Sequence, residues 1–88
     1  IPATIDPSDI NFTASNMSSG ETGPQLTLKV FDNIYDLSGI VPSYYADPDC
    51  TTPVNIETAS EGEYYVRIAI EIDNYQPINP VASFFKEA

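Results

Sequence analysis

The sequence contains no histidine, no tryptophan and a single cysteine, Cys50. One cysteine cannot form a disulfide within the chain, and without histidine there is no Cys/His set to bind zinc. A cysteine nucleophile needs a neighbouring base, and the usual one, histidine, is missing. We therefore expect a domain that packing alone stabilises, with no enzymatic activity.

Basic residues are almost as scarce. Thirteen Asp and Glu residues stand against Lys29, Arg67 and Lys86, which gives a net charge of −10. A surface this acidic repels the phosphate backbone of nucleic acids and the anionic surface of a membrane. The chain also lacks a run of about 18 apolar residues that would span a bilayer. We therefore expect no nucleic-acid partner and no direct membrane insertion.

Amphipathic helical patterns are missing too. Eight prolines interrupt nearly every extended segment, and a helix-rich fold would not tolerate them. Two windows without internal proline, residues 8 to 23 and 54 to 63, show no convincing apolar stripe at helical spacing. A ubiquitin-like β-grasp fold, which needs one amphipathic helix, is therefore only the alternative to an all-β fold.

The clearest positive feature is the segment from residue 64 to residue 72. Bulky apolar residues occupy every second position: Tyr64, Val66, Ile68, Ile70 and Ile72. Because successive side chains of a strand point to opposite faces, this period of two predicts a half-buried β-strand. Its intervening residues, among them Arg67 and Glu71, are expected to face water.

Shorter segments of the same kind occur along the rest of the chain. We expect an edge strand broken by a turn over residues 3 to 14, a loop over 15 to 25, and further extended segments at 26–31, 34–35, 40–46, 51–56 and 81–86. About six or seven short strands at this spacing predict an antiparallel β-sandwich, and an immunoglobulin-like one is our first choice. At 88 residues the chain is one domain.

The second half of the chain carries a series of short motifs. They are Tyr44-Tyr45 followed by Asp47, Cys50-Thr51-Thr52-Pro53, Glu61-Gly62-Glu63-Tyr64-Tyr65-Val66, Asp73-Asn74-Tyr75 and Ala82-Ser83-Phe84-Phe85-Lys86. In this order, over residues 26 to 88, the chain resembles the MBG and related Ig-like repeat modules of bacterial secreted and surface proteins. The resemblance implies an extracellular location, at the cell surface, and tandem repetition.

The resemblance also implies a role. Such modules often act as spacers and are sometimes linked to adhesion or glycan contact, and the resemblance implies no catalysis. We therefore expect residues 1 to 88 to be a single Ig-like module cut from a longer multidomain chain, with neighbouring modules as its partners. The ends Ile1-Pro2 and Lys86-Glu87-Ala88 are typical of a unit that is joined to others.

Tyrosines are the first candidates for a binding site. Pairs occur at Tyr44-Tyr45 and Tyr64-Tyr65, and in each pair one ring must face the core and the other must face out. Outward rings on adjacent strands would form a platform on which a glycan or a host protein packs. Cross-strand packing explains the same rings without a ligand. The candidate ligand-binding residues are Tyr44, Tyr45, Tyr65 and Tyr75, with Tyr45 and Tyr65 favoured by strand alternation.

Turn carboxylates are the candidates for a metal site. Asp47, Asp49 and Asp73 would bind calcium if their loops converged at one end of a sandwich, because calcium takes six to eight oxygen ligands. The chain has no Asp-x-Asp-x-Asp-Gly loop, however, and Asp-Pro and Asp-Asn pairs are ordinary turn residues. We expect no cofactor, and any calcium site would be weak and structural.

Overall fold

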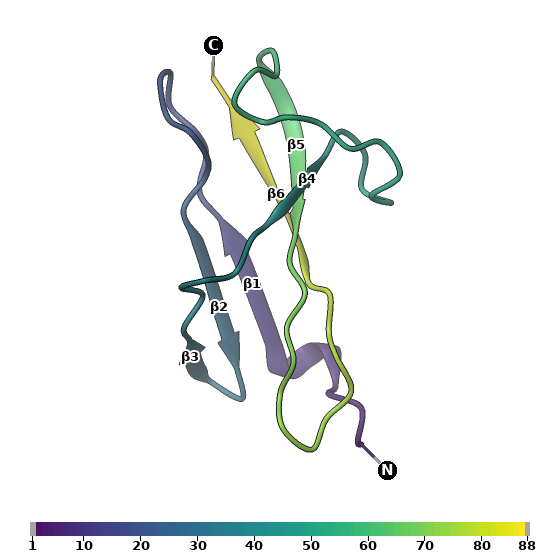
Figure 1. The fold of residues 1–88 in the computed structure, drawn as a ribbon. Helices are drawn as coiled ribbons and strands as arrows, with labels where there is room; N and C mark the ends of the chain where they lie inside the picture. Colours follow the sequence, from purple (N-terminus) through teal and green to yellow (C-terminus); the bar gives the residue numbers. More distant parts are fainter. Residues whose placement is uncertain (1, 88) are drawn as a thin grey trace.

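The computed structural model describes residues 2–87. They form a short 3-10 helix and six strands: η1 (Pro7–Asp9), β1 (Ile10–Ala14), β2 (Leu26–Val30), β3 (Asn33–Tyr35), β4 (Ser43–Tyr45), β5 (Gly62–Arg67) and β6 (Val81–Lys86). The strands pair into two three-stranded antiparallel sheets, in the orders β1-β2-β3 and β4-β5-β6 (Figure 1). The prediction of an all-β antiparallel sandwich is confirmed.

Helix is almost absent from the described residues. The one helical element there, η1, has three residues, so the amphipathic helix that a β-grasp fold requires is not formed within residues 2–87. No helix in this part of the chain has the length and hydropathy to cross a bilayer.

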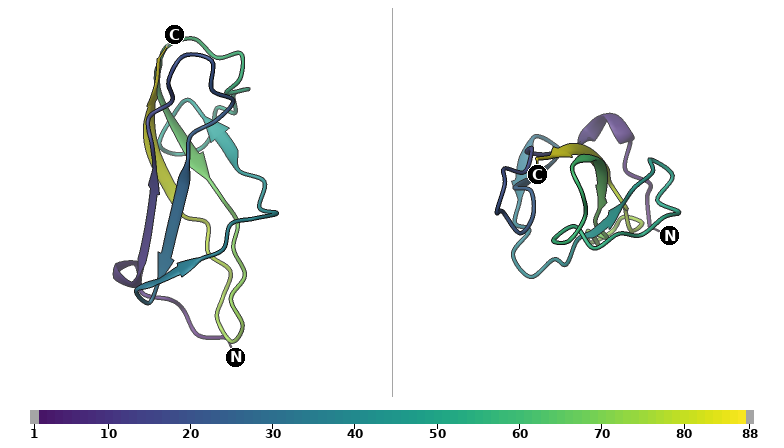
Figure 2. Two further views of the ribbon diagram at one scale, coloured as in Figure 1. Left: turned by 90° about the vertical axis from the view of Figure 1, so that its left-hand side faces the viewer. Right: turned by 90° about the horizontal axis from the view of Figure 1, so that it is seen from above.

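The molecule is a rod. Its principal dimensions are 45 × 25 × 22 Å. The first and last parts of the chain lie at opposite ends of the long axis, with the N-terminus beside the loop that follows β5 and the C-terminus beside the loop that precedes it (Figures 1 and 2). Backbone contacts agree with this placement, because Ala3 bridges to Tyr75 at one pole and Glu87 donates to the carbonyl oxygen of Met17 near the other.

The side chains of residues 64 to 70 alternate as their sequence predicts. The buried ones are those of Tyr64, Val66, Ile68 and Ile70. The residues between them are half-buried or exposed. Inner-face residues of the first sheet, such as Leu28 and Val30, meet this row from the opposite side. The core therefore lies between the inner faces of the two sheets.

The core consists of two clusters along the rod. One contains Met17, Ile56, Tyr64, Val66, Ala82 and Phe84, with side chains of β1 and β2 packed against it. The other contains Ile5, Leu28, Val30, Ile68 and Ile70. The first cluster takes residues from both sheets, whereas the second packs the first sheet against Ile68 and Ile70, which follow β5. The alternating side chains of residues 64 to 70 therefore contribute to both clusters.

The segment after β1 joins the two sheets. β1 pairs with β2 in the first sheet, and three residues beyond its end Met17 bridges in parallel to Lys86 of β6 in the second. The amide of Met17 donates to the carbonyl oxygen of Phe85 at 2.8 Å, and the side-chain oxygen of Asn16 accepts from the amide of Phe85 at 3.0 Å. Met17, which lies in the predicted polar loop 15 to 25, is fully buried.

The turn before β1 follows from local chemistry. Asp6 caps η1: its carboxylate accepts hydrogen bonds from the amide and the hydroxyl of Ser8, both at 2.9 Å. Pro7 suits the first helical position, where its missing N–H group is not needed. These bonds lower the pKa of Asp6, with the Ser8 amide as the largest cause. The predicted break in the N-terminal strand is therefore present.

The turn between β2 and β3 differs from the sequence prediction. Phe31, predicted to extend the strand, and Asp32 form a two-residue turn with φ values of 52° and 62°, and Val30 pairs with Asn33 across it. Two positive φ values define the hairpin turn whose twist matches the strands, and Asn-Gly is its usual sequence. Phe-Asp gives no such signal, so the turn is not recognisable from sequence.

Three other predicted extended segments are shorter than expected. The predicted strand 64–72 ends at Arg67 in β5, and beyond it pairing continues only in part, through the bridge between Ile70 and Ile78. Pro77 and Pro80 flank Ile78 and have no amide hydrogen to donate, so a continuous ladder cannot form there. Likewise, the segment 40–46 forms a strand only at Ser43–Tyr45, and 51–56 contributes one bridge, between Pro53 and Tyr45.

Candidate functional site

The outward side of the second sheet gathers the two favoured tyrosines. Strand pairing places Tyr45 opposite Tyr65, and Tyr65 opposite Ser83. On the same side Arg67 pairs with Val81, and Glu63 pairs with Phe85. We call this surface the outer face; its residues are Ser43, Tyr45, Glu63, Tyr65, Arg67, Val81, Ser83 and Phe85.

Arg67 and Tyr45 make two contacts with each other on the outer face. The Nη2 atom of Arg67 donates to the hydroxyl oxygen of Tyr45 at 3.1 Å, and its Cζ atom lies 5.2 Å from the centre of the same ring. This distance is in the range of a cation–π contact, in which the ring attracts the positive charge. The ring of Tyr45 therefore fixes the position of the only basic side chain on the outer face.

Tyr65 pairs with an acid. Its hydroxyl donates to the carboxylate of Glu63 at 2.8 Å, and this hydrogen bond is the main reason why the pKa of Tyr65 is raised. Glu63 and Arg67 are four residues apart on one strand, about 13 Å along the backbone, and the hydrogen bond of Arg67 goes to Tyr45 and not to Glu63. The acid therefore holds the tyrosine and does not neutralise the guanidinium.

The other two candidate tyrosines lie elsewhere. Tyr44 faces the core, where its ring meets that of Phe84 edge-on at 6.0 Å, and burial raises the pKa of Tyr44. Tyr75 follows β5 towards the N-terminal pole and packs on Phe31 with ring centres 5.5 Å apart. Both rings are half-buried. Of the four tyrosines, only Tyr45 and Tyr65 share one surface.

The carboxylates proposed for calcium do not gather. Among residues 2–87 no three His, Cys, Asp or Glu side chains lie close enough together to hold a metal ion, so Asp47, Asp49 and Asp73 do not meet the condition that their loops converge. Asp47 instead organises its own loop, because its carboxylate accepts from the amides of Thr51 and Thr52 and from the hydroxyl of Thr51. The Thr51 hydroxyl is the largest cause of the lowered pKa of Asp47.

Lys86 has a buried side chain that sequence analysis did not single out. Its Nζ atom donates to the backbone carbonyl oxygens of Ile56, at 2.7 Å, and Ala59. The loop before β5 is therefore fastened to β6. We call these hydrogen bonds of Lys86 the Lys86 clamp. Beside it, a hollow of about 430 Å³ near the C-terminal pole is bordered by four carboxylates, those of Glu21, Glu57, Glu61 and Glu87.

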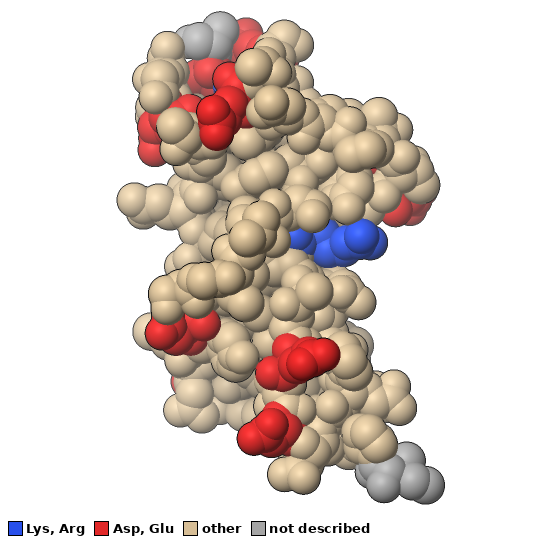
Figure 3. Space-filling model, viewed as in Figure 1, with Lys and Arg blue, Asp and Glu red and all other residues tan. Residues whose placement is uncertain are grey.

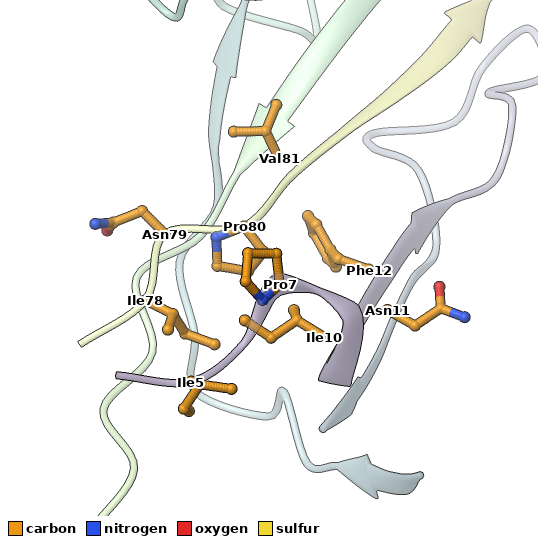
Figure 4. Close-up of a pocket in the computed structure, with 9 residues that line it drawn as sticks. All are labelled: Ile5, Pro7, Ile10, Asn11, Phe12, Ile78, Asn79, Pro80 and Val81. Atoms are coloured by element: carbon orange, nitrogen blue, oxygen red, sulfur yellow. The ribbon is translucent and has the colours of Figure 1, made fainter. Parts of the chain in front are cut away.

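A groove of about 490 Å³ lies between the N-terminal segment with β1 and the approach to β6 (Figure 4). Its lining is Ile5, Pro7, Ile10, Asn11, Phe12, Ile78, Asn79, Pro80 and Val81, which includes no charged residue. β1 and β6 are edge strands of different sheets. They join near Met17 and separate towards this groove, and Val81 belongs both to the groove and to the outer face.

The distribution of charge distinguishes the outer face from the rest of the surface. Figure 3 shows carboxylate side chains spread from one pole to the other, densest at the upper pole, whereas basic side chains show mainly at one place near the middle of that view. Of the three basic residues, Lys86 is buried and Lys29 lies on β2 of the other sheet. Arg67 is the one that belongs to the second sheet's outward side.

The sequence predicted the outward direction of Arg67 but none of its contacts. The residues of the outer face come from β4, β5 and β6. The loop between β4 and β5 is long, so the sequence does not determine that Tyr45 pairs with Tyr65. Val81, Ser83 and Phe85 were not among the predicted site residues. Phe85 stood out only through the adjacent Phe84-Phe85 pair, whose members take opposite faces.

Comparison with known proteins finds no relative: no protein-family model, no curated protein and no solved structure matches this chain. The resemblance to MBG and related Ig-like repeats therefore stays a prediction.

Proposed function

We propose that this chain is a non-catalytic, Ig-like spacer module of a bacterial surface or secreted protein, and that it holds neighbouring modules apart. One observation carries the proposal: the chain enters a rod 45 Å long at one pole and leaves it at the other. Modules joined to the two ends would be separated by the length of the rod. The resemblance of residues 26 to 88 to bacterial Ig-like repeats supports the same role.

The contacts between the sheets favour a rigid spacer. Met17, which follows β1, bonds to β6 through backbone hydrogen bonds. One hydrophobic cluster takes side chains from both sheets, and the other packs the first sheet against Ile68 and Ile70, which follow β5. Lys86 fastens the loop before β5 at the C-terminal pole. Because these hydrogen bonds and hydrophobic contacts are distributed along the rod, we expect the rod to resist bending.

The composition suits an exposed location. A net charge of −10 keeps a small domain soluble and prevents association between like-charged copies. With one cysteine and no disulfide, the module does not depend on an oxidising environment for its stability. Such a module would be tolerated in many copies along one polypeptide.

The test is the length of tandem arrays. Small-angle X-ray scattering is measured on one, two and four copies joined directly, and the largest dimension should grow by about 40 to 45 Å per copy, from the 45 Å of a single rod. A matched array with flexible Gly/Ser linkers should grow roughly as the square root of copy number. If the direct array is as compact as the linked one, the module is not a rigid spacer.

A further inference from the structure

Arg67 presents an unusual arrangement on an acidic molecule. Its recorded hydrogen bond is to the neutral hydroxyl of Tyr45, and the carboxylate on the same face, Glu63, is engaged by Tyr65. A guanidinium group has five N–H donors in a planar fork that matches a carboxylate. One donor is used on Tyr45, so the others remain for an anionic group from outside the chain.

The position of that guanidinium is fixed before any ligand binds. The hydrogen bond and the cation–π contact both come from the Tyr45 ring, which is itself set by the pairing of β4 with β5. Binding therefore costs little of the rotamer entropy that a free arginine would lose. This is the preorganisation that distinguishes a binding residue from a solvated surface charge.

Two exposed apolar side chains of β6 share the outer face with Arg67, whose partner on β4 is the polar Ser43. Val81 lies opposite Arg67, and Phe85 lies diagonally from Tyr65, within reach of an aromatic side chain. Both Val81 and Phe85 leave 41% of their surface exposed. The hydroxyl of Ser83, which is exposed opposite Tyr65, supplies a donor and acceptor between them.

Sugars match this combination. A pyranose ring has apolar C–H faces that pack on aromatic rings and hydroxyl groups at its edge, and a uronic or sialic acid adds a carboxylate. We propose that the outer face binds a carboxylate-bearing saccharide, whose carboxylate is received by Arg67 while its ring packs on Tyr65 and Phe85 and its hydroxyls reach Ser83. This inference is independent of the spacer role.

Charge selects this ligand over a larger acidic partner. The chain carries −10, so a polyanion such as an acidic protein segment is repelled along its whole length. A single carboxylate on a neutral sugar is opposed only locally. At about 0.15 M salt the Debye length is about 8 Å, so Arg67 acts at close range while the distant carboxylates are screened.

The test is an NMR titration of the ¹⁵N-labelled protein at that salt concentration. The probes are three trisaccharides that each carry a single carboxylate, on a galacturonate, a glucuronate or a sialic acid residue. At least one of these should produce saturable shifts at the amides of Tyr45, Tyr65 and Ser83. The methyl ester of the same sugar, which lacks the charge, should bind about tenfold or more weakly, as expected for loss of a charged hydrogen bond. Acetate alone should not saturate.

Variants assign the effect to individual residues. Arg67→Gln should weaken binding about tenfold or more, whereas Lys29→Gln, an equal change in net charge on the other sheet, should leave it unchanged. If Arg67→Gln perturbs the fold, Ser83→Tyr is the second variant. Its side chain fills the centre of the outer face from an exposed position and should therefore weaken sugar binding. The protein spectrum reports folding in each case.

Five results would overturn the proposal. Four of them are the absence of saturable shifts with all three acidic sugars, equal binding of an acid and its ester, shifts with acetate that match those with the sugar, and equal losses in Arg67→Gln and Lys29→Gln. An acidic peptide that binds the outer face more tightly than the sugars would also replace the saccharide as the ligand. None of these results changes the length of the tandem arrays, so the spacer proposal is judged separately.

Discussion

At the scale of single residues, the three basic side chains have three different environments. Lys86 is buried and bonded to carbonyl oxygens, Arg67 is half-buried against Tyr45, and Lys29 is exposed on β2. The neighbouring residues in the sequence do not predict these differences, because the hydrogen-bond partners of Arg67 and Lys86 lie about 20 to 30 residues away. Only the outward direction of Arg67 followed from strand alternation.

The clamp formed by Lys86 gives a stability prediction. Lys86→Met keeps the aliphatic stem but leaves the carbonyl oxygens of Ile56 and Ala59 without their donor. We expect a loss of about 1 to 3 kcal/mol in the free energy of unfolding, measured by urea denaturation. Lys29→Met removes the same charge at an exposed position and should change stability by about 0.5 kcal/mol or less. Equal losses in the two variants would mean that net charge, not the clamp, sets the cost.

At the scale of elements, β5 decides which side chains enter the core. Tyr64 packs near Phe84, with ring centres 6.4 Å apart, and its hydroxyl donates to the carbonyl oxygen of Ser60 at 2.7 Å. The next residue, Tyr65, lies on the outer face. The two neighbouring tyrosines therefore serve opposite purposes, one in the core and one at the surface.

The pair allows a direct test of this orientation. Tyr64→Ala should cost about 3 to 5 kcal/mol of unfolding free energy because it empties a core position. Tyr65→Ala removes a cross-strand surface contact and should cost about 1 kcal/mol or less. Thermal or urea denaturation of both variants under one condition gives the comparison. A larger loss for Tyr65→Ala would show that the two sides of the sheet are reversed.

Elements with strong periodicity were the ones that the sequence predicted well. The alternation from Tyr64 to Ile70, the turn at Asp6-Pro7 and the absence of long helix in the described residues all follow from side-chain period and proline placement. Elements set by tertiary contacts were missed. The hairpin turn at Phe31-Asp32 lacks the usual residues, and Met17 is buried because β6 lies beside it.

The candidate site was likewise predicted in part: strand alternation predicted some of its residues, and strand pairing decides the others. Strand alternation selected Tyr45 and Tyr65 from four tyrosines, and the structure places these two together. The register that joins them to Ser83, Val81 and Phe85 depends on which strands pair and with what offset. Sequence patterns carry no such information when the connecting loops are long.

At the scale of the whole molecule, the chain ends and the outer face occupy different parts of the rod. The first and last parts of the chain lie at the poles (Figures 1 and 2). The outer face, on the second sheet, carries Tyr45, Tyr65, Phe85 and Arg67. A module of this shape can be joined to neighbours at both poles without covering its side. The spacer role and the saccharide site are therefore compatible in one array.

The measurement that most directly tests the account is the distance between the two poles in solution. Spin labels are placed at Ala3→Cys and Glu87→Cys, which are exposed positions, in a Cys50→Asn background. Asn is chosen because residue 50 has a φ of 57°, which asparagine tolerates. Pulsed electron paramagnetic resonance should give one narrow distribution near the 45 Å long dimension. A broad distribution, or one centred near the 22 to 25 Å short dimensions, would contradict the rigid rod on which the spacer proposal rests.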